Sequence, residues 1–145
     1  MNNLRRALQA VAVAVLAVAA GTAGASADNR LLVKLPAPMQ EHMLANMLDH
    51  LQTLDQINRA LAEGRWNDAA DIAERRLGVS SLAAHGAGHM APYMPQPMQA
   101  IGTAMHRAAT DFAVHVTEGD LRQSVKQLGE VTRQCVACHA AYRIR

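Results

Sequence analysis

The chain has 145 residues, of which 50% are hydrophobic but only 3% aromatic, and it holds eight methionines, seven histidines and two cysteines. Lysine and arginine number 14 against 12 aspartate and glutamate residues, so no strong positive charge favours nucleic acid or an acidic membrane surface as a partner. With so few aromatic residues, a core of alanine, methionine and valine is underfilled unless a large apolar group occupies it.

Residues 1–27 have the pattern of a cleavable signal peptide. Arg5 and Arg6 precede an apolar run from Ala7 to Ala20, and Ala25-Ser26-Ala27 fits the small-residue cleavage site. The run is too short for a typical membrane-spanning helix, although an uncleaved anchor is the alternative. We therefore expect a periplasmic protein whose mature chain, residues 28–145, forms one domain without membrane insertion.

Four amphipathic helices are predicted after an extended segment that ends at Pro38. Apolar residues recur at helical spacing over residues 39–61, 66–77, 98–115 and 121–142. Gly64, Gly78 and Gly119 separate these stretches, and Asp120 is placed to cap the last helix. Residues 79–96 are irregular and nothing in the mature chain has the pattern of a strand. The expected fold is all-α, an antiparallel four-helix bundle.

Each helix has an apolar face that is expected to pack inward. On the first and last helices these faces comprise Met39, Met43, Met47, Leu51, Leu54, Ile57 and Leu61, and Leu121, Val125, Leu128, Thr132, Cys135, Cys138, His139 and Tyr142.

The strongest motif is Cys135-Val136-Ala137-Cys138-His139, the attachment pattern of a c-type haem. At about 100° per residue, a helix places Cys138 roughly 60° to one side of Cys135 and His139 roughly 40° to the other. The two thiols can then form thioethers with the haem vinyl groups while the imidazole coordinates the iron. The sequence thus predicts one covalent haem c on the C-terminal helix.

Three other uses of the cysteines are weaker. A redox-active pair usually stands at a helix start in a βαβ setting, whereas this pair lies near the end of an all-α chain. A disulfide between residues three apart on a helix is poorly formed and leaves His139 unexplained. A zinc site needs a fourth ligand and usually a second close pair.

The last stretch, residues 119–145, resembles the end of the cytochrome c′ family, because the haem motif lies near the C-terminus and Tyr142-Arg143 follows it. The likeness covers the layout of the whole mature chain and is specific in this stretch. It implies a four-helix bundle with Cys135 and Cys138 holding the haem, His139 as the axial iron ligand and Arg143 near the haem. A solvated cation at the helix end is the other interpretation of Arg143.

The resemblance extends to the first helix. Family members show Arg-Gln followed three residues later by a Leu or Met on the distal side of the iron. Gln40 and Met43 match this spacing, so Met43 is implied as the distal ligand, as in low-spin members. Met39 stands where the family has the arginine. The contact that this arginine makes with a haem propionate therefore has no counterpart on the first helix. The family also implies a homodimer through the first two helices.

Two functions follow from the sixth iron position. A Met43 thioether gives a low-spin iron suited to electron transfer with redox partner proteins. An open site would instead bind NO or CO. His50 and His106 are rival ligands, although single helical histidines more often lie on the surface or in the core.

A second cluster of soft ligands lies in the irregular segment and suits Cu(I), so copper binding is a further hypothesis. It consists of His85, His89, Met90, Met94 and Met98. No triad, carboxylate pair or phosphate loop stands out, so the sequence does not indicate an enzyme.

Overall fold

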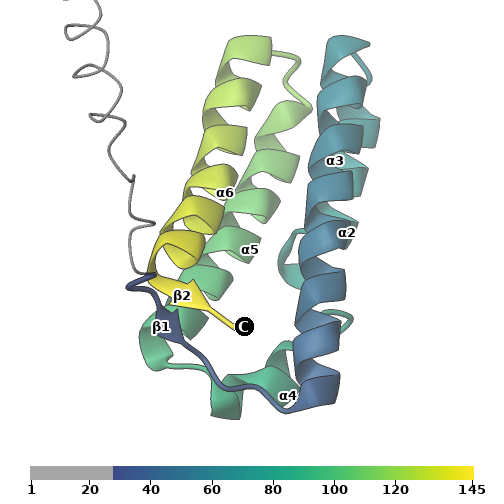
Figure 1. Ribbon diagram of the computed structural model, residues 1–145. Helices are drawn as coiled ribbons and strands as arrows, with labels where there is room; N and C mark the ends of the chain where they lie inside the picture. Colours follow the sequence, from purple (N-terminus) through teal and green to yellow (C-terminus); the bar gives the residue numbers. More distant parts are fainter. Residues whose placement is uncertain (1–27) are drawn as a thin grey trace, which may run out of the picture.

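The computed structural model describes residues 28–145, so the expected signal peptide lies outside the described residues. This part of the chain is mostly helical, and its four long helices run alternately up and down (Figure 1). The elements are β1 (Leu31–Leu32), α2 (Ala37–Ala62), α3 (Trp66–Arg76), η1 (Val79–Ser81), α4 (Ala87–Met90), η2 (Ala91–Tyr93), α5 (Gln96–Val116), α6 (Leu121–Ala141) and β2 (Tyr142–Arg143).

The long helices pack in chain order. α2 packs on α3, α3 on α5 and α5 on α6, whereas α2 and α6 are not among the pairs in extensive contact. The irregular segment, with η1, α4 and η2, crosses one end of the molecule between α3 and α5 (Figure 1). The space between α2 and α6 is therefore not closed by direct packing of these two helices, and a site can form there.

The helix boundaries follow the predicted signals. Gly64 after α2 has φ of +68° and Gly119 before α6 has φ of +77°, conformations that favour glycine. The Asp120 carboxylate accepts a hydrogen bond from the Gln123 backbone N–H at 3.0 Å, which confirms the predicted cap. α5 begins at Gln96, with Pro97 in its first turn.

The core has two parts of different composition. The larger cluster is aliphatic around Phe112, which is fully buried together with Ile57, Leu77 and Val116. The second cluster has Val33 and three buried methionines, Met43, Met90 and Met98, with further methionines packed against it. Methionine fills irregular space without fixing a single packing, so this second part is the less rigidly specified half of the interior.

The expectation that no strand would form is wrong. β1 and β2 pair in parallel, with Leu31 opposite Tyr142 and Leu32 opposite Arg143 (Figure 1). The Val33 N–H also donates to the Arg143 carbonyl at 2.8 Å. Two-residue strands are too short to leave a periodic pattern in the sequence, and their pairing joins the two ends of the described chain.

Four residues of the faces expected to pack inward on the first and last helices are exposed. Leu51, Leu121 and Val125 have 66%, 51% and 57% of their surface accessible, and His139 is also exposed. Helical geometry gives the reason for Leu51. Steps of four residues drift by about 40° each, so Leu51 lies about 80° from Met43, whereas His50, seven residues on, lies within about 20°. His50 is accordingly the buried residue of the two.

We expect Phe112→Ala to lower the free energy of unfolding by about 3–5 kcal/mol, because it removes a fully buried ring from the larger cluster. Urea unfolding followed by circular dichroism measures this loss. Val114→Ala on the same helix is the control, since Val114 is 63% exposed and should change stability by less than about 0.5 kcal/mol. Equal effects of the two substitutions would contradict this placement of the core.

Candidate functional site

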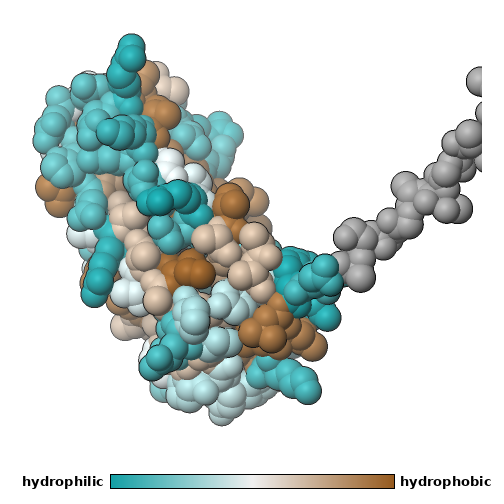
Figure 2. All heavy atoms as spheres, turned by 90° about the vertical axis from the view of Figure 1, so that its left-hand side faces the viewer, coloured by the Kyte–Doolittle hydropathy of each residue, from teal (hydrophilic) through white to brown (hydrophobic). Residues whose placement is uncertain are grey.

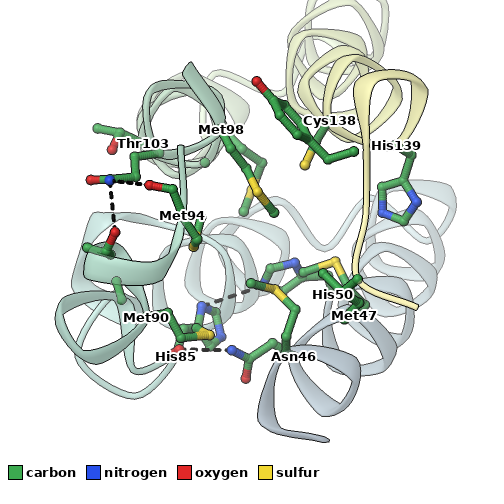
Figure 3. Close-up of a pocket in the computed structure, with 18 of the residues that line it drawn as sticks. Asn46, Met47, His50, His85, Met90, Met94, Met98, Thr103, Cys138 and His139 are labelled. Atoms are coloured by element: carbon green, nitrogen blue, oxygen red, sulfur yellow. Dashed lines mark hydrogen bonds between the residues drawn. The ribbon is translucent and has the colours of Figure 1, made fainter. Parts of the chain in front are cut away.

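A cavity of about 580 Å³ opens between α2, α5, α6 and the irregular segment. This volume is in the range of small-molecule and cofactor sites. The cavity wall is mainly apolar and rich in sulfur, and in Figure 3 the sulfur atoms of Met94, Met98 and Cys138 point into the same space. The methionines on the wall are Met43, Met47, Met90, Met94, Met98 and Met105.

The structure brings two of the three haem-motif residues to this cavity. Cys138 and His139 lie on its wall, at the C-terminal end of α6 (Figure 3). Cys135, one turn earlier, does not line it. Cys135 is half-buried against the larger core cluster, with its sulfur 3.6 Å from the Val131 carbonyl oxygen.

No disulfide joins the two cysteines. Burial raises the pKa of the Cys135 thiol and of the Cys138 thiol. A redox-active CxxC pair needs a lowered pKa on the attacking thiol, so this environment does not favour thiol–disulfide exchange.

Met43, the implied distal ligand, lies on the wall of the same cavity and is 9% exposed. Met47, one turn on, also lines it, whereas Met39 packs in the methionine cluster without reaching the wall. His42 is exposed, as expected. The Gln40 side chain donates to the Ile144 carbonyl oxygen and so ties the start of α2 to the C-terminal tail.

Arg143 lies in β2, beyond the end of α6, and lines the cavity. Its Nε is buried without a hydrogen-bond partner and is 3.6 Å from the Asp28 carboxylate. The Arg30 guanidinium donates to Asp28 at 2.8 Å and to the His139 carbonyl at 3.4 Å. Hydrogen bonds to the Asp28 carboxylate from the Arg30 side chain and the Arg30 backbone N–H lower the pKa of Asp28 to about 2. Guanidinium groups from both ends of the described chain thus meet beside His139.

Three histidines that looked unrelated in the sequence converge at the cavity. The ring centroids of His50 and His85 are 4.7 Å apart, those of His85 and His106 are 5.4 Å apart, and those of His50 and His106 are 6.1 Å apart. All three residues are buried and line the cavity. We call them the histidine cluster. The only sequence signal for this cluster is that His50 lies on the same face of α2 as Met43. No sequence signal predicts that His85 contacts His50.

Carbonyl groups fix where the protons lie in part of this cluster. His106 Nδ1 is 2.8 Å from the Leu77 carbonyl oxygen, which only accepts, so Nδ1 carries the hydrogen. The Ser81 hydroxyl donates to the Gly78 carbonyl at 2.7 Å. The Ser81 oxygen is therefore left as an acceptor for neighbouring imidazoles.

The other two rings contact each other. His85 Nδ1 is 3.4 Å from His50 Nε2 and also 3.4 Å from the Ser81 oxygen. One nitrogen of the His50–His85 pair donates to the other, and the tautomer of the rings decides which one. Burial lowers the pKa of His50 to about 4 and also lowers the pKa of His85. The two imidazoles are thus neutral at pH 7 and share one hydrogen.

The sequence-predicted copper set is only partly assembled. His85, Met90, Met94 and Met98 lie on the cavity wall, whereas His89 is exposed and does not reach it. Within residues 28–145, no three histidine, cysteine, aspartate or glutamate side chains are disposed to hold a metal ion.

No protein-family model, curated protein or solved structure matches this chain.

The free energy of unfolding should fall by about 2 kcal/mol between pH 7.5 and pH 5 because of His50. Its pKa is about 4 in the folded chain against an ordinary value of 6.5, so acidification protonates the unfolded chain first. Stability from the neutral ring is therefore lost as the pH falls through this window. Urea unfolding at both pH values measures the loss.

His50→Gln should flatten this pH dependence, whereas His115→Gln, at an exposed position, should leave it unchanged. An equally steep dependence in His50→Gln and the parent chain would contradict the burial of a neutral imidazole.

Proposed function

We propose that this chain is a periplasmic c-type cytochrome of the cytochrome c′ type, an antiparallel four-helix bundle that carries one covalent haem and transfers electrons. The observation that carries the proposal is the position of the haem motif: Cys138 and His139 stand on the wall of a sulfur-rich apolar cavity of about 580 Å³. An attachment motif on a surface away from any cavity would not support it.

The residues present fit a haem. Cys135 and Cys138 would hold it through thioether bonds and His139 would coordinate the iron, which supplies a one-electron redox centre when bound. The cavity wall offers the apolar surface that a porphyrin buries. Cys135 lies half-buried one turn from the wall, so its side chain has to turn toward the cavity for the second thioether to form.

The arginines around His139 support the fit. A haem carries two propionate groups, and Arg30, Arg143 and Arg145 line the cavity. The Arg143 Nε is buried with no hydrogen-bond partner, which is costly unless an acceptor joins it. A carboxylate is the acceptor that a guanidinium binds best. In the family, an arginine on the first helix contacts a haem propionate. Arg143, at the other end of this chain, offers the same kind of contact.

Electron transfer is favoured over gas binding by the wall opposite the haem motif. Met43 is buried on that wall, and Met47 lies beside it. A thioether ligand fills the sixth position and keeps the coordination of the iron similar in both oxidation states, whereas binding of NO or CO needs an open position. If the thioethers only pack, the gas-binding alternative is the correct one.

The surface suits protein partners. Figure 2 shows apolar surface in the middle of the face carried by α6 and at the end where β1 lies. Val125 and Val136 on α6 and Leu31 in β1 are exposed apolar residues, and a redox partner that covers α6 would approach close to the haem motif. Leu48 and Leu51 are exposed on α2, which supports the homodimer implied by the family resemblance. Within residues 28–145, no helix has the length and apolarity needed to cross a membrane.

The haem should be covalent. After acid–acetone extraction of the denatured protein, we expect the haem to stay with the chain, because two thioether bonds hold it. A thiol reagent should titrate no free cysteine. The variant with both Cys135→Ala and Cys138→Ala is the control and should release all haem. Extraction of haem from the parent chain, or titration of two thiols, would contradict the proposal.

Met43 should be the sixth iron ligand. The ferric absorption spectrum should be low-spin with a methionine–iron charge-transfer band in the far red. Met43→Ala should abolish this band, make the iron high-spin and allow CO to bind. Met39→Ala is the matched control, since Met39 does not reach the cavity wall, and should keep the band.

Three other outcomes would revise this assignment. Loss of the band in Met47→Ala alone would move the ligand by one helical turn. Loss of the band in Met39→Ala would show that the face of α2 is wrongly placed. A parent chain that is already high-spin and binds CO would favour gas binding.

A further inference from the structure

We propose that the histidine cluster is a second metal site, in which His50 Nε2 and His85 Nδ1 bind Cu(I) together with a methionine sulfur of the cavity wall. The proposal does not depend on the haem, because its ligands come from α2 and the irregular segment and not from α6. It changes the sequence-predicted copper set by replacing His89 with His50.

The spacing of the two nitrogens fits a shared ion. His50 Nε2 and His85 Nδ1 are 3.4 Å apart. Two imidazole nitrogens at about 2.0–2.1 Å from one ion, at a tetrahedral angle, lie roughly 3.3–3.4 Å apart. The two rings therefore need little movement to bind an ion between them. The hydrogen that they share is all that occupies this line.

The proton balance of binding is simple. In the metal-free pair, one of the two facing nitrogens carries the hydrogen that the other accepts. When the ion binds, this hydrogen leaves that nitrogen and the other nitrogen of the same ring takes one up, so both ligands stay neutral. No oxidation or reduction is involved, and the site gains one positive charge. A single charge costs less to bury than the double charge of Zn²⁺.

A contact between the two elements holds the pair in place. The Asn46 side chain donates to the His85 carbonyl at 2.9 Å and so ties α2 to the irregular segment (Figure 3). His106 is held by the Leu77 carbonyl through its own Nδ1 and backs the pair without being assigned as a ligand.

The remaining ligand determines the metal. No third histidine, cysteine or carboxylate within residues 28–145 completes a set of metal ligands, whereas thioethers are abundant on this wall. Met47 lies three residues before His50 on the same helix, and Met90 is buried and lines the cavity with His85. Neutral imidazole with thioether is the ligand combination that selects Cu(I) over Zn²⁺.

Anaerobic titration of the purified full chain with Cu(I), in competition with a coloured Cu(I) chelator, tests the site. We expect one ion per chain. His50→Gln and His85→Gln should each weaken binding at least tenfold, because loss of a ligand should cost no less than the 10–100-fold typical of an outer partner. His89→Gln is the matched control for the sequence-predicted set and should bind as the parent chain does.

X-ray absorption of the copper-loaded chain should show nitrogen and sulfur around the ion. Met90→Leu and Met47→Leu keep the volume of the side chain and test the sulfur, with Met39→Leu as their control. Circular dichroism shows whether each histidine variant is folded. If one is not, the methionine variants and the X-ray absorption spectrum still test whether copper binds at this site.

The proposal is overturned if His89→Gln weakens binding as much as His50→Gln, if the parent chain binds no ion, or if sulfur is absent from the absorption spectrum. Binding of Zn²⁺ as tight as that of Cu(I) would also overturn it. A chain that carries haem but binds no copper would overturn only this inference. A chain that binds copper but carries no haem would overturn only the proposed function.

Discussion

The methionine-lined cavity between α2, α5 and α6 is the constraint on which the rest of this structure depends. Its volume of about 580 Å³ is in the range of small-molecule and cofactor sites. The aromatic-poor composition explains why side chains do not close it: Phe112 serves the larger core cluster, and methionines line the rest. An interior of this kind is suited to hold a large apolar group.

The cavity has two chemically different ends. At one end, Cys138 and His139 face it beside the guanidinium groups from both ends of the described chain, where positive charge and an attachment motif coincide. At the other, the neutral rings of His50 and His85 share a hydrogen among thioethers. The pairing of β1 with β2 holds the first end in place, and the hydrogen bond from Asn46 to the His85 carbonyl holds the second.

The sequence by itself determined the four long helices, their ends and the haem motif. Gly64, Gly119 and the Asp120 cap act within a few residues, so their effect is readable without knowledge of the fold. The motif Cys135 to His139 is local in the same sense, because helical geometry alone relates its three side chains. The placement of Met43 on an inward face followed from periodicity on a single helix, and the structure agrees with it.

Only the tertiary structure decided the contacts between residues far apart in the chain. Nothing in the sequence pattern brings His50 to His85, 35 residues away, because His85 lies in an irregular segment without periodicity. The pattern predicted no strand, yet two-residue segments from both ends of the described chain pair and place Arg143 at the cavity. Leu51 is exposed and His50 is buried because the drift of about 40° over four residues accumulates along a helix of 26 residues. The spacing of residues along the sequence determines on which face of a helix a side chain lies. Whether that face is buried depends on which other element packs against it.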